Sequence, residues 1–168
     1  MNSAEDYTLT LGLAGTYWGE RYPEFDVLLD GRLIMSDKII AVPSQKGLPN
    51  PHPLPAEIEE LTRQKYDIDV AIEPGDHVLS VVFKNKLPDD TSGFQPDGTW
   101  QNDKLIHIES VCFDGVDLDH LIFSESRYTW VDADGQTQTR DNCTTMAWNG
   151  SWDLKFSTPF YLWMLERF

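Results

Sequence analysis

Thr144–Phe156 reads TTMAWNGSWDLKF and places two tryptophans on either side of an Asn-Gly pair. Asn-Gly is favoured at the centre of a two-residue type I′ turn, because both turn positions adopt a positive φ. The pair therefore predicts a β-hairpin in which Trp148 pairs with Ser151 and Ala147 pairs with Trp152. Since side chains alternate along a strand, the two indole rings would point to opposite faces of this hairpin.

The alternation assigns a different environment to each ring. Trp152 shares its face with Leu154 and Phe156, so we expect it in the core, whereas Trp148 lies on the polar face and is expected to be accessible. A three-residue loop would pair the two rings directly and reverse this expectation. An accessible indole can stack on the apolar face of a sugar while nearby polar groups bond its hydroxyls, and the alternative is an aromatic ring half covered by a loop.

The same period-two pattern recurs along the chain and predicts strands at 7–13, 25–29, 33–35, 66–72, 78–83, 105–113 and 128–131. Turn signals separate these runs, at Asp30-Gly31, Pro74-Gly75, Asp114-Gly115 and Asp132–Gly135. Short strands at this spacing are typical of a sandwich or barrel. We therefore predict a single domain over 1–168 that is all-β, an antiparallel, jelly-roll-like β-sandwich with one or two short helices.

Three segments depart from the strand pattern. Residues 43–56 are rich in proline and residues 86–102 in Asp, Gly and Pro, which predicts two long loops, and 56–64 suits one short helix. The apolar tail 158–168 predicts a short helix or a last strand. This tail either docks on its own sandwich or reaches a neighbouring subunit, and the second case predicts a homo-oligomer formed through Phe160–Phe168.

Charge and composition exclude several classes of partner. The 168 residues carry a formal net charge of -15, which disfavours nucleic acid and anionic membranes. The start of the chain lacks the features of a signal peptide, and no run is long enough to span a membrane, so we expect a soluble protein. Cys112 is expected in the core and Cys143 in a polar loop, and a bridge between them is left open.

The acidic residues of the long loop suggest a metal rather than an enzyme. Asp89, Asp90, Asp97 and Asp103 could supply oxygen ligands to calcium, and the alternative is a series of ordinary turn residues. The sequence lacks the usual motifs of hydrolases, zinc enzymes and phosphate-binding loops. We therefore expect a protein that is not an enzyme.

Gly75–Leu118 resembles the calcium-dependent xylan-binding carbohydrate-binding modules, through GDHVLSVVFKNK, a polar loop and NDKLIHIESVCFDGVDL. Phe83 and Asn85 match a strand that ends in Phe-x-Asn-Asp, Asp103 leads the next strand, and Asp114-Gly115 matches its turn. Lys86 stands where the family has an acidic residue. The resemblance implies a β-sandwich whose loop carboxylates bind calcium, which in turn holds sugar hydroxyls.

The chain also resembles small acidic proteins of marine tailed phages, through DGVDLDHLIF at 114–123 and AWNGSWDLKFSTPFYLWML at 147–165. This second resemblance implies a virion-associated or accessory β-sandwich that binds other virion proteins.

Together these features predict a non-catalytic carbohydrate-binding module, with a virion structural protein as the alternative. The predicted sugar site combines Trp148, Asn85 and Asp103 with Trp100, which stands alone in the polar loop.

Overall fold

The computed structural model describes residues 3–17, 21–40, 42–43, 63–94, 96 and 100–168. The longer strands are β1 (Glu5–Tyr17), β2 (Glu24–Leu29), β3 (Arg32–Lys38), β5 (Gln64–Ile72), β6 (Gly75–Phe83), β9 (Leu105–Phe113), β11 (Ser126–Val131), β12 (Thr137–Asp141) and β14 (Gly150–Thr158). The short strands are β4 (Val42–Pro43), β7 (Ser92–Phe94), β8 (Trp100–Asn102), β10 (Val116–Asp117) and β13 (Thr145–Met146). Helices α2 (Leu121–Ser124) and α3 (Phe160–Leu165) and the 3-10 turn Pro88–Asp90 complete the described elements.

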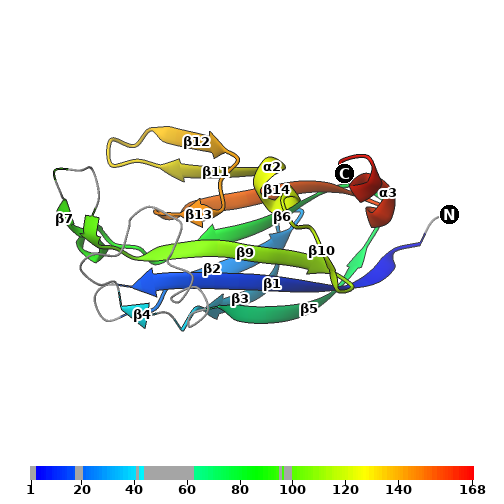
Figure 1. Ribbon diagram of the computed structural model, residues 1–168, viewed down its shortest axis with the longest axis horizontal. Coiled ribbons are helices and arrows are strands. Elements are labelled where there is room, and N and C mark those ends of the chain that lie inside the picture. The colour runs from blue at the N-terminus through cyan, green and yellow to red at the C-terminus, as the bar shows by residue number, and fades with distance from the viewer. Residues whose placement is uncertain (1–2, 18–20, 41, 44–62, 95, 97–99) are drawn as a thin grey trace.

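Two six-stranded sheets form the layers of a sandwich (Figure 1). One sheet has the order β10-β9-β1-β4, with β5 also paired to β1 and β13 to β9, and the other has the order β12-β11-β14-β6-β2-β3. Among the pairs of described strands, β1 and β4 run parallel and the others antiparallel. The predicted all-β sandwich with short helices is confirmed.

Alternate side chains of both sheets fill the space between them. β1 contributes Tyr7, Leu9, Leu11 and Leu13, and the facing sheet contributes Phe25, Val27, Leu79, Val81, Phe83, Trp152, Leu154 and Phe156. A bulge shifts the alternation in β9, because Gly12 pairs with Ser110 whereas Leu13 pairs with Ile108. The extra residue lets Ile106 and Ile108 face the core as well as Val111 and Phe113.

Two of the expected tight turns have the backbone that a type I′ turn requires. Asp30 and Gly31 join β2 to β3 with φ of 51 and 76°, and Asp114 and Gly115 join β9 to β10 with φ of 50 and 78°. Pro74-Gly75 forms a different kind of corner, since β5 pairs with β1 in one sheet and β6 pairs with β14 in the other.

The predicted hairpin at Asn149-Gly150 is wrong. β13 pairs with β9 in one sheet while β14 pairs with β6 and β11 in the other, so residues 147–149 cross between the sheets. Neither Asn149 nor Gly150 has a positive φ. The side-chain amide of Asn149 instead makes two hydrogen bonds to the backbone of Lys86, as a paired strand residue would. Its Oδ1 accepts from Lys86 N at 2.7 Å, and its Nδ2 donates to Lys86 O at 2.8 Å.

The two indole rings still differ in exposure, although the hairpin is absent. Trp152 is fully buried at 0% exposure and donates Nε1 to Cys143 O at 2.7 Å, whereas Trp148 is half-buried. The cysteines differ from expectation: Cys143 belongs to the core, Cys112 is half-buried, and both are free thiols.

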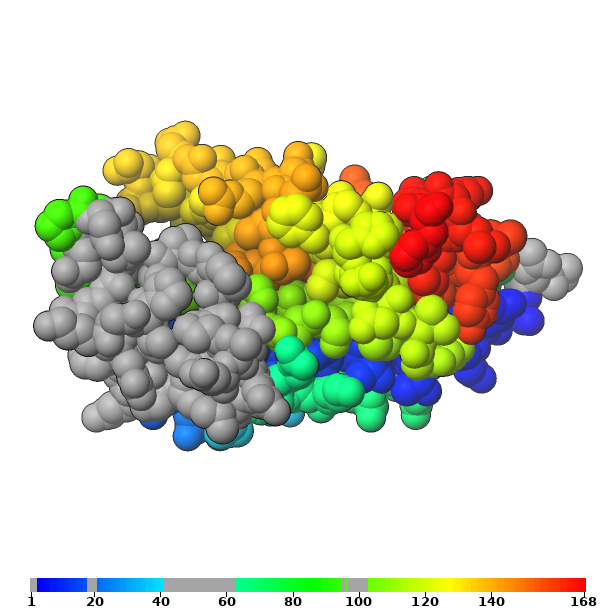
Figure 2. Space-filling model, in the orientation of Figure 1, coloured from blue at the N-terminus to red at the C-terminus, as the bar shows by residue number. Residues whose placement is uncertain are grey.

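The tail forms α3 and closes one end of the sandwich. Figure 2 shows it (red) at the end where β1 begins (blue). Phe160, Trp163 and Met164 are buried in the core, which confirms docking on its own domain. The opposite face exposes Tyr161, Leu162, Leu165 and Phe168. An oligomer formed through this tail stays a prediction.

The two predicted loops are described to different extents. Most of 43–56 lies outside the described residues, as does most of the predicted helix 56–64, and Gln64 begins β5. Within 86–102, the chain forms the 3-10 turn and the two-stranded β7–β8 sheet.

Candidate functional site

Three connections meet at one end of the sandwich, which we call the loop end (left in Figure 1). They are residues 84–91 between β6 and β7, 103–104 between β8 and β9, and 147–149 between β13 and β14. Lys86 bonds both Asp103 and the carbonyl of Ala147, so the three connections are in contact.

Trp148 is fixed at the loop end through its own backbone. The Tyr128 hydroxyl, from β11, donates to Trp148 O at 2.6 Å and accepts from Trp148 N at 2.9 Å. The Tyr128 ring is buried, and burial raises the pKa of its hydroxyl, which keeps this group protonated. The Lys86 ammonium lies 5.2 Å from the centroid of the indole. The backbone of Trp148 is therefore held by two hydrogen bonds, and its half-buried ring has a cation–π contact with Lys86.

Asn85 precedes Lys86 in the same connection, and its side chain already has two backbone partners. Its Oδ1 accepts from Glu24 N at 2.9 Å, and its Nδ2 donates to Tyr22 O at 2.9 Å. The amide therefore joins the start of β2 to the end of β6. Direct contact of Asn85 with a sugar stays a prediction.

Trp100 opens β8 and pairs in register with Phe94 of β7. The Trp100 side chain lies outside the described part of the structure, and Phe94 is 63% exposed. The small β7–β8 sheet thus carries an exposed aromatic ring at the loop end, and a role for Trp100 stays a prediction.

Asp103 and Asp90 are both buried, and each faces a buried lysine. Asp103 Oδ1 accepts from Lys86 Nζ and from the backbone N of Lys104 at 2.8 Å. Asp90 Oδ2 lies 3.0 Å from Lys104 Nζ. The structure therefore brings Asp103 and Trp148 together around the Lys86 ammonium, whereas the Asn85 side chain is bound at the start of β2.

These two carboxylates do not fit a calcium site as they are arranged here. Calcium takes about six to eight oxygen ligands, and the facing carboxylate oxygens of Asp90 and Asp103 are already bound to ammonium groups. Among the described residues, no group of three or more His, Cys, Asp or Glu side chains is arranged to hold a metal. Asp89 is exposed and Asp97 lies outside the described residues, so the predicted set as a whole stays a prediction.

Trp130 is a half-buried aromatic at the same end that sequence reasoning missed. Its ring stacks on Tyr128 with the centroids 4.7 Å apart and the planes at 19°. It pairs in register with Gly150, where an added Cβ would lie 2.3 Å from Thr129 O and 2.9 Å from Trp130 Cβ. Its place two residues after Tyr128 could have indicated that the two rings share a face of the strand, but only the strand register shows that a glycine lies opposite Trp130.

His77 lies between a carboxylate and a hydroxyl, as in a catalytic triad: its Nδ1 lies 2.8 Å from Asp30 Oδ2, and its Nε2 lies 3.3 Å from Thr158 Oγ1. However, Nε2 is closer to Glu73 O, at 2.7 Å, and a carbonyl only accepts, so this nitrogen carries a proton. The Thr158 hydroxyl also donates to Glu73 O at 2.7 Å. These groups tie the end of β14 to the β5–β6 corner and do not form a nucleophile with its base.

His107 has the structural role that its place on a strand indicates. Burial lowers its pKa to about 4, and the charge of Arg63 acts in the same direction. Its Nε2 lies 3.0 Å from Glu109 Oε1, and its Nδ1 lies 3.1 Å from Thr145 Oγ1. The neutral ring can accept from the Thr145 hydroxyl through Nδ1, with Nε2 beside the Glu109 carboxylate.

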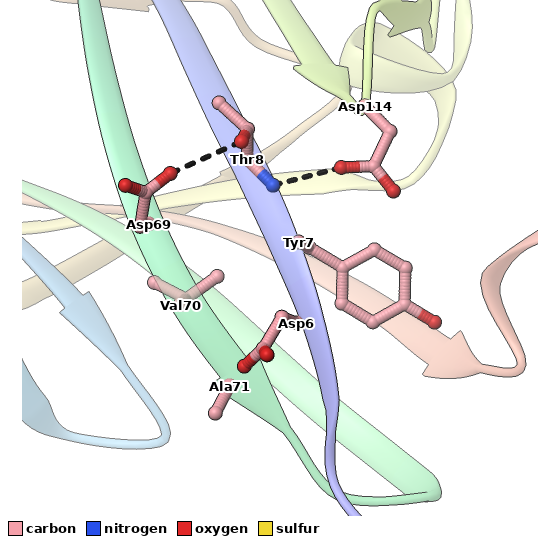
Figure 3. A pocket seen from close by; sticks show the side chains of 7 residues that line it. All are labelled: Asp6, Tyr7, Thr8, Asp69, Val70, Ala71 and Asp114. Carbon is pink, nitrogen blue, oxygen red and sulfur yellow. Dashed lines mark hydrogen bonds between the residues drawn. The ribbon is translucent and has the colours of Figure 1, made fainter.

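A polar groove of about 400 Å³ lies at the opposite end, beside the start of β1 and the β9–β10 turn (Figure 3). Asp69 and Asp114 both point at Thr8: Asp69 Oδ1 accepts from Thr8 Oγ1 at 3.0 Å, and Asp114 Oδ1 accepts from Thr8 N at 2.8 Å. These bonds account for the orientation of both carboxylates. We therefore assign the groove to the polar surface of the sheet.

Within the described residues, the helices are too short and insufficiently apolar for any of them to cross a membrane.

Comparison with known proteins finds a shared fold. No protein-family model and no curated protein matches the chain. A structure of vCBM60 in complex with galactobiose is 12% identical, covers 88% of this chain and 96% of its own, and has a TM-score of 0.48. A selenomethionine form of vCBM60 is 13% identical over 88% of this chain and 89% of its own, with a TM-score of 0.50. The latter is described in the context of circular permutation between two families of calcium-dependent carbohydrate-binding modules. Its similarity supports the β-sandwich fold, and the phage resemblance stays a prediction.

Proposed function

We propose that this chain is a non-catalytic carbohydrate-binding module that holds a sugar against Trp148 at the loop end. The observation that carries the proposal is the fixation of Trp148, whose backbone N and O both bond the buried Tyr128 hydroxyl. An indole stacks on the apolar face of a sugar, and a ring that is already fixed loses little conformational entropy on binding.

The structural neighbour supports the class of function. vCBM60 has a β-sandwich of the same kind and is described as a calcium-dependent carbohydrate-binding module. A fold does not by itself set a function, so recognition must come from the residues of the loop end. Those residues are Trp148 together with the nearby aromatics Trp130 and Phe94, which are half-buried and exposed respectively.

The charge of the chain favours a neutral glycan. A formal net charge of -15 repels polyanionic sugars such as uronates and sulfated chains. Neutral polysaccharides and oligosaccharides, which are bound by stacking and hydrogen bonds, avoid this repulsion.

Calcium held by Asp90 and Asp103 has no part in the binding proposed here. The neighbour is described as calcium-dependent, but Asp90 and Asp103 of this chain are paired with Lys104 and Lys86. Glycan binding should therefore be measured both with calcium and with chelator.

A second candidate is docking to another protein subunit through the outer face of α3. The exposed fractions of Leu162 and Leu165, 59 and 74%, favour it, because apolar side chains gathered on one face often mark a contact surface. Light scattering of the wild type and of Leu165→Asp tests this candidate. It requires that the wild type forms an assembly and that Leu165→Asp is a monomer.

The carbohydrate proposal is tested by titrating the full chain with neutral polysaccharides and oligosaccharides, after a glycan array has identified a ligand. Trp148→Ala should weaken binding about tenfold or more, which corresponds to about 1.4 kcal/mol. Phe123→Ala removes an exposed aromatic of α2 and should leave affinity unchanged. Absence of any glycan ligand in either calcium condition, or equal affinity of Trp148→Ala and wild type, would contradict the proposal.

A further inference from the structure

Two lysines are buried at the loop end, Lys86 at 3% and Lys104 at 1% exposure. Lysine is seldom buried unless its charge is paired. The chain has 13 Lys and Arg against 28 Asp and Glu, so most carboxylates have no lysine or arginine available to them. Two of its few cations are nevertheless placed inside one group of connections.

Each ammonium binds one carboxylate oxygen and one backbone carbonyl oxygen. Lys86 Nζ contacts Asp103 Oδ1 and Ala147 O, and Lys104 Nζ lies 3.0 Å from Asp90 Oδ2 and 3.3 Å from Asn85 O. Carboxylate and carbonyl oxygens are also the ligands that a hard divalent cation takes in proteins. In this structure, the two ammonium groups bind these oxygens.

The two ion pairs act on one another. Burial is the main influence on Lys86 and lowers its pKa, while Asp103 and Asp90 act to raise it and Lys104 acts to lower it. The four groups therefore form one cluster with two positive and two negative charges. The formal charges of these four groups sum to zero.

Further bonds attach the cluster to the surrounding backbone. Asp103 Oδ1 accepts from Thr91 Oγ1 at 2.7 Å, and Asp90 Oδ2 accepts from Leu87 N at 2.7 Å. Through Ala147 O the cluster also reaches the connection that carries Trp148. It thus joins all three connections of the loop end.

We infer that Lys86 and Lys104 act as built-in cations that hold the three connections of the loop end together, so that this end folds without a divalent metal ion. The basis is the occupancy of the carboxylate and carbonyl oxygens by ammonium groups. The inference does not depend on whether the chain binds a sugar.

The first test measures metal dependence in the full wild-type chain without any glycan. Calorimetric melting is recorded in buffer alone, with about 5 mM calcium chloride and with chelator, because a ligand that binds only the native state raises the melting temperature. Terbium luminescence, excited through tryptophan, serves as a second probe. We expect melting temperatures that agree within about 1 °C across the three conditions and no terbium signal that calcium displaces. A loss of several degrees in chelator that calcium restores, or a saturable terbium signal displaced by calcium, overturns the inference.

The second test removes each built-in cation. Lys86→Gln and Lys104→Gln leave a buried carboxylate without its partner, so both should lower the melting temperature by many degrees. Lys155→Gln changes an exposed lysine of β14 and is the matched control, expected to melt within about 1 °C of wild type. Melting of the two variants like this control overturns the inference.

A double variant covers the case in which Lys86→Gln does not fold. Lys86→Met with Asp103→Leu removes both charges of one pair and should melt above Lys86→Gln, since no uncompensated charge remains. If the double variant melts no higher than Lys86→Gln, or if both fail to fold, charge compensation is not what the lysine supplies and the inference fails.

Discussion

Tyr128→Phe tests whether the position of Trp148 depends on a single hydroxyl. The substitution keeps the buried ring and its stack on Trp130, at 4.7 Å between centroids, and removes only the oxygen that bonds Trp148 N and O. The Trp148 backbone then loses both of these partners.

The expected cost follows from the two bonds. Each intramolecular hydrogen bond contributes about 0.5–1.5 kcal/mol net, and a buried polar group left unpaired costs up to about 3 kcal/mol. Because Trp148 is half-buried, water can reach part of its surroundings and replace some of this loss. We therefore expect Tyr128→Phe to reduce the free energy of unfolding by about 1–3 kcal/mol.

Equilibrium unfolding in urea, followed by tryptophan fluorescence and circular dichroism, measures this change. The midpoint should fall while the denaturant slope stays the same, because the surface exposed on unfolding is unchanged. Tyr161→Phe, at an exposed position of α3, is the control and should unfold like wild type. A loss for Tyr128→Phe below about 0.5 kcal/mol, no larger than that of the control, would refute the idea that this hydroxyl fixes Trp148.

Three further predictions concern the rest of the sandwich. Burial lowers the pKa of His107 in the folded state to about 4, below the unfolded value of about 6.5. Its contribution to the free energy of unfolding is therefore complete above pH 6.5, and it falls by at most about 1.4 kcal/mol per pH unit as the pH drops from about 6.5 to about 4. His107→Gln should flatten this part of a pH–stability profile measured by unfolding in urea. Gly150→Ala should cost about 3 kcal/mol or prevent folding, because its Cβ would meet a carbonyl oxygen at 2.3 Å, whereas Ser151→Ala should cost less than about 1 kcal/mol in the same thermal melts. Deletion of residues 160–168 should lower the melting temperature by many degrees because it removes Phe160 from the core, and an unchanged melting temperature would show that α3 is dispensable.

Local sequence patterns determined the layers of this protein. Apolar residues at every second position show which face of a strand is buried, and this pattern lies within the strand itself. Trp152, Leu154 and Phe156 were therefore correctly assigned to the core. Asp-Gly pairs fixed two tight turns for the same reason, because a positive φ is a property of the residues in the turn. The fold class followed from these local properties.

Only the tertiary structure decided how the loop end is built. Asn149 looked like a turn residue, but its side chain pairs with Lys86, which is 63 positions away in the sequence. Asp103 likewise looked like a metal ligand, and its burial against Lys86 depends on how two separate connections meet. Such contacts are set by which strands become neighbours across the two sheets, a long-range property that no short window of sequence contains.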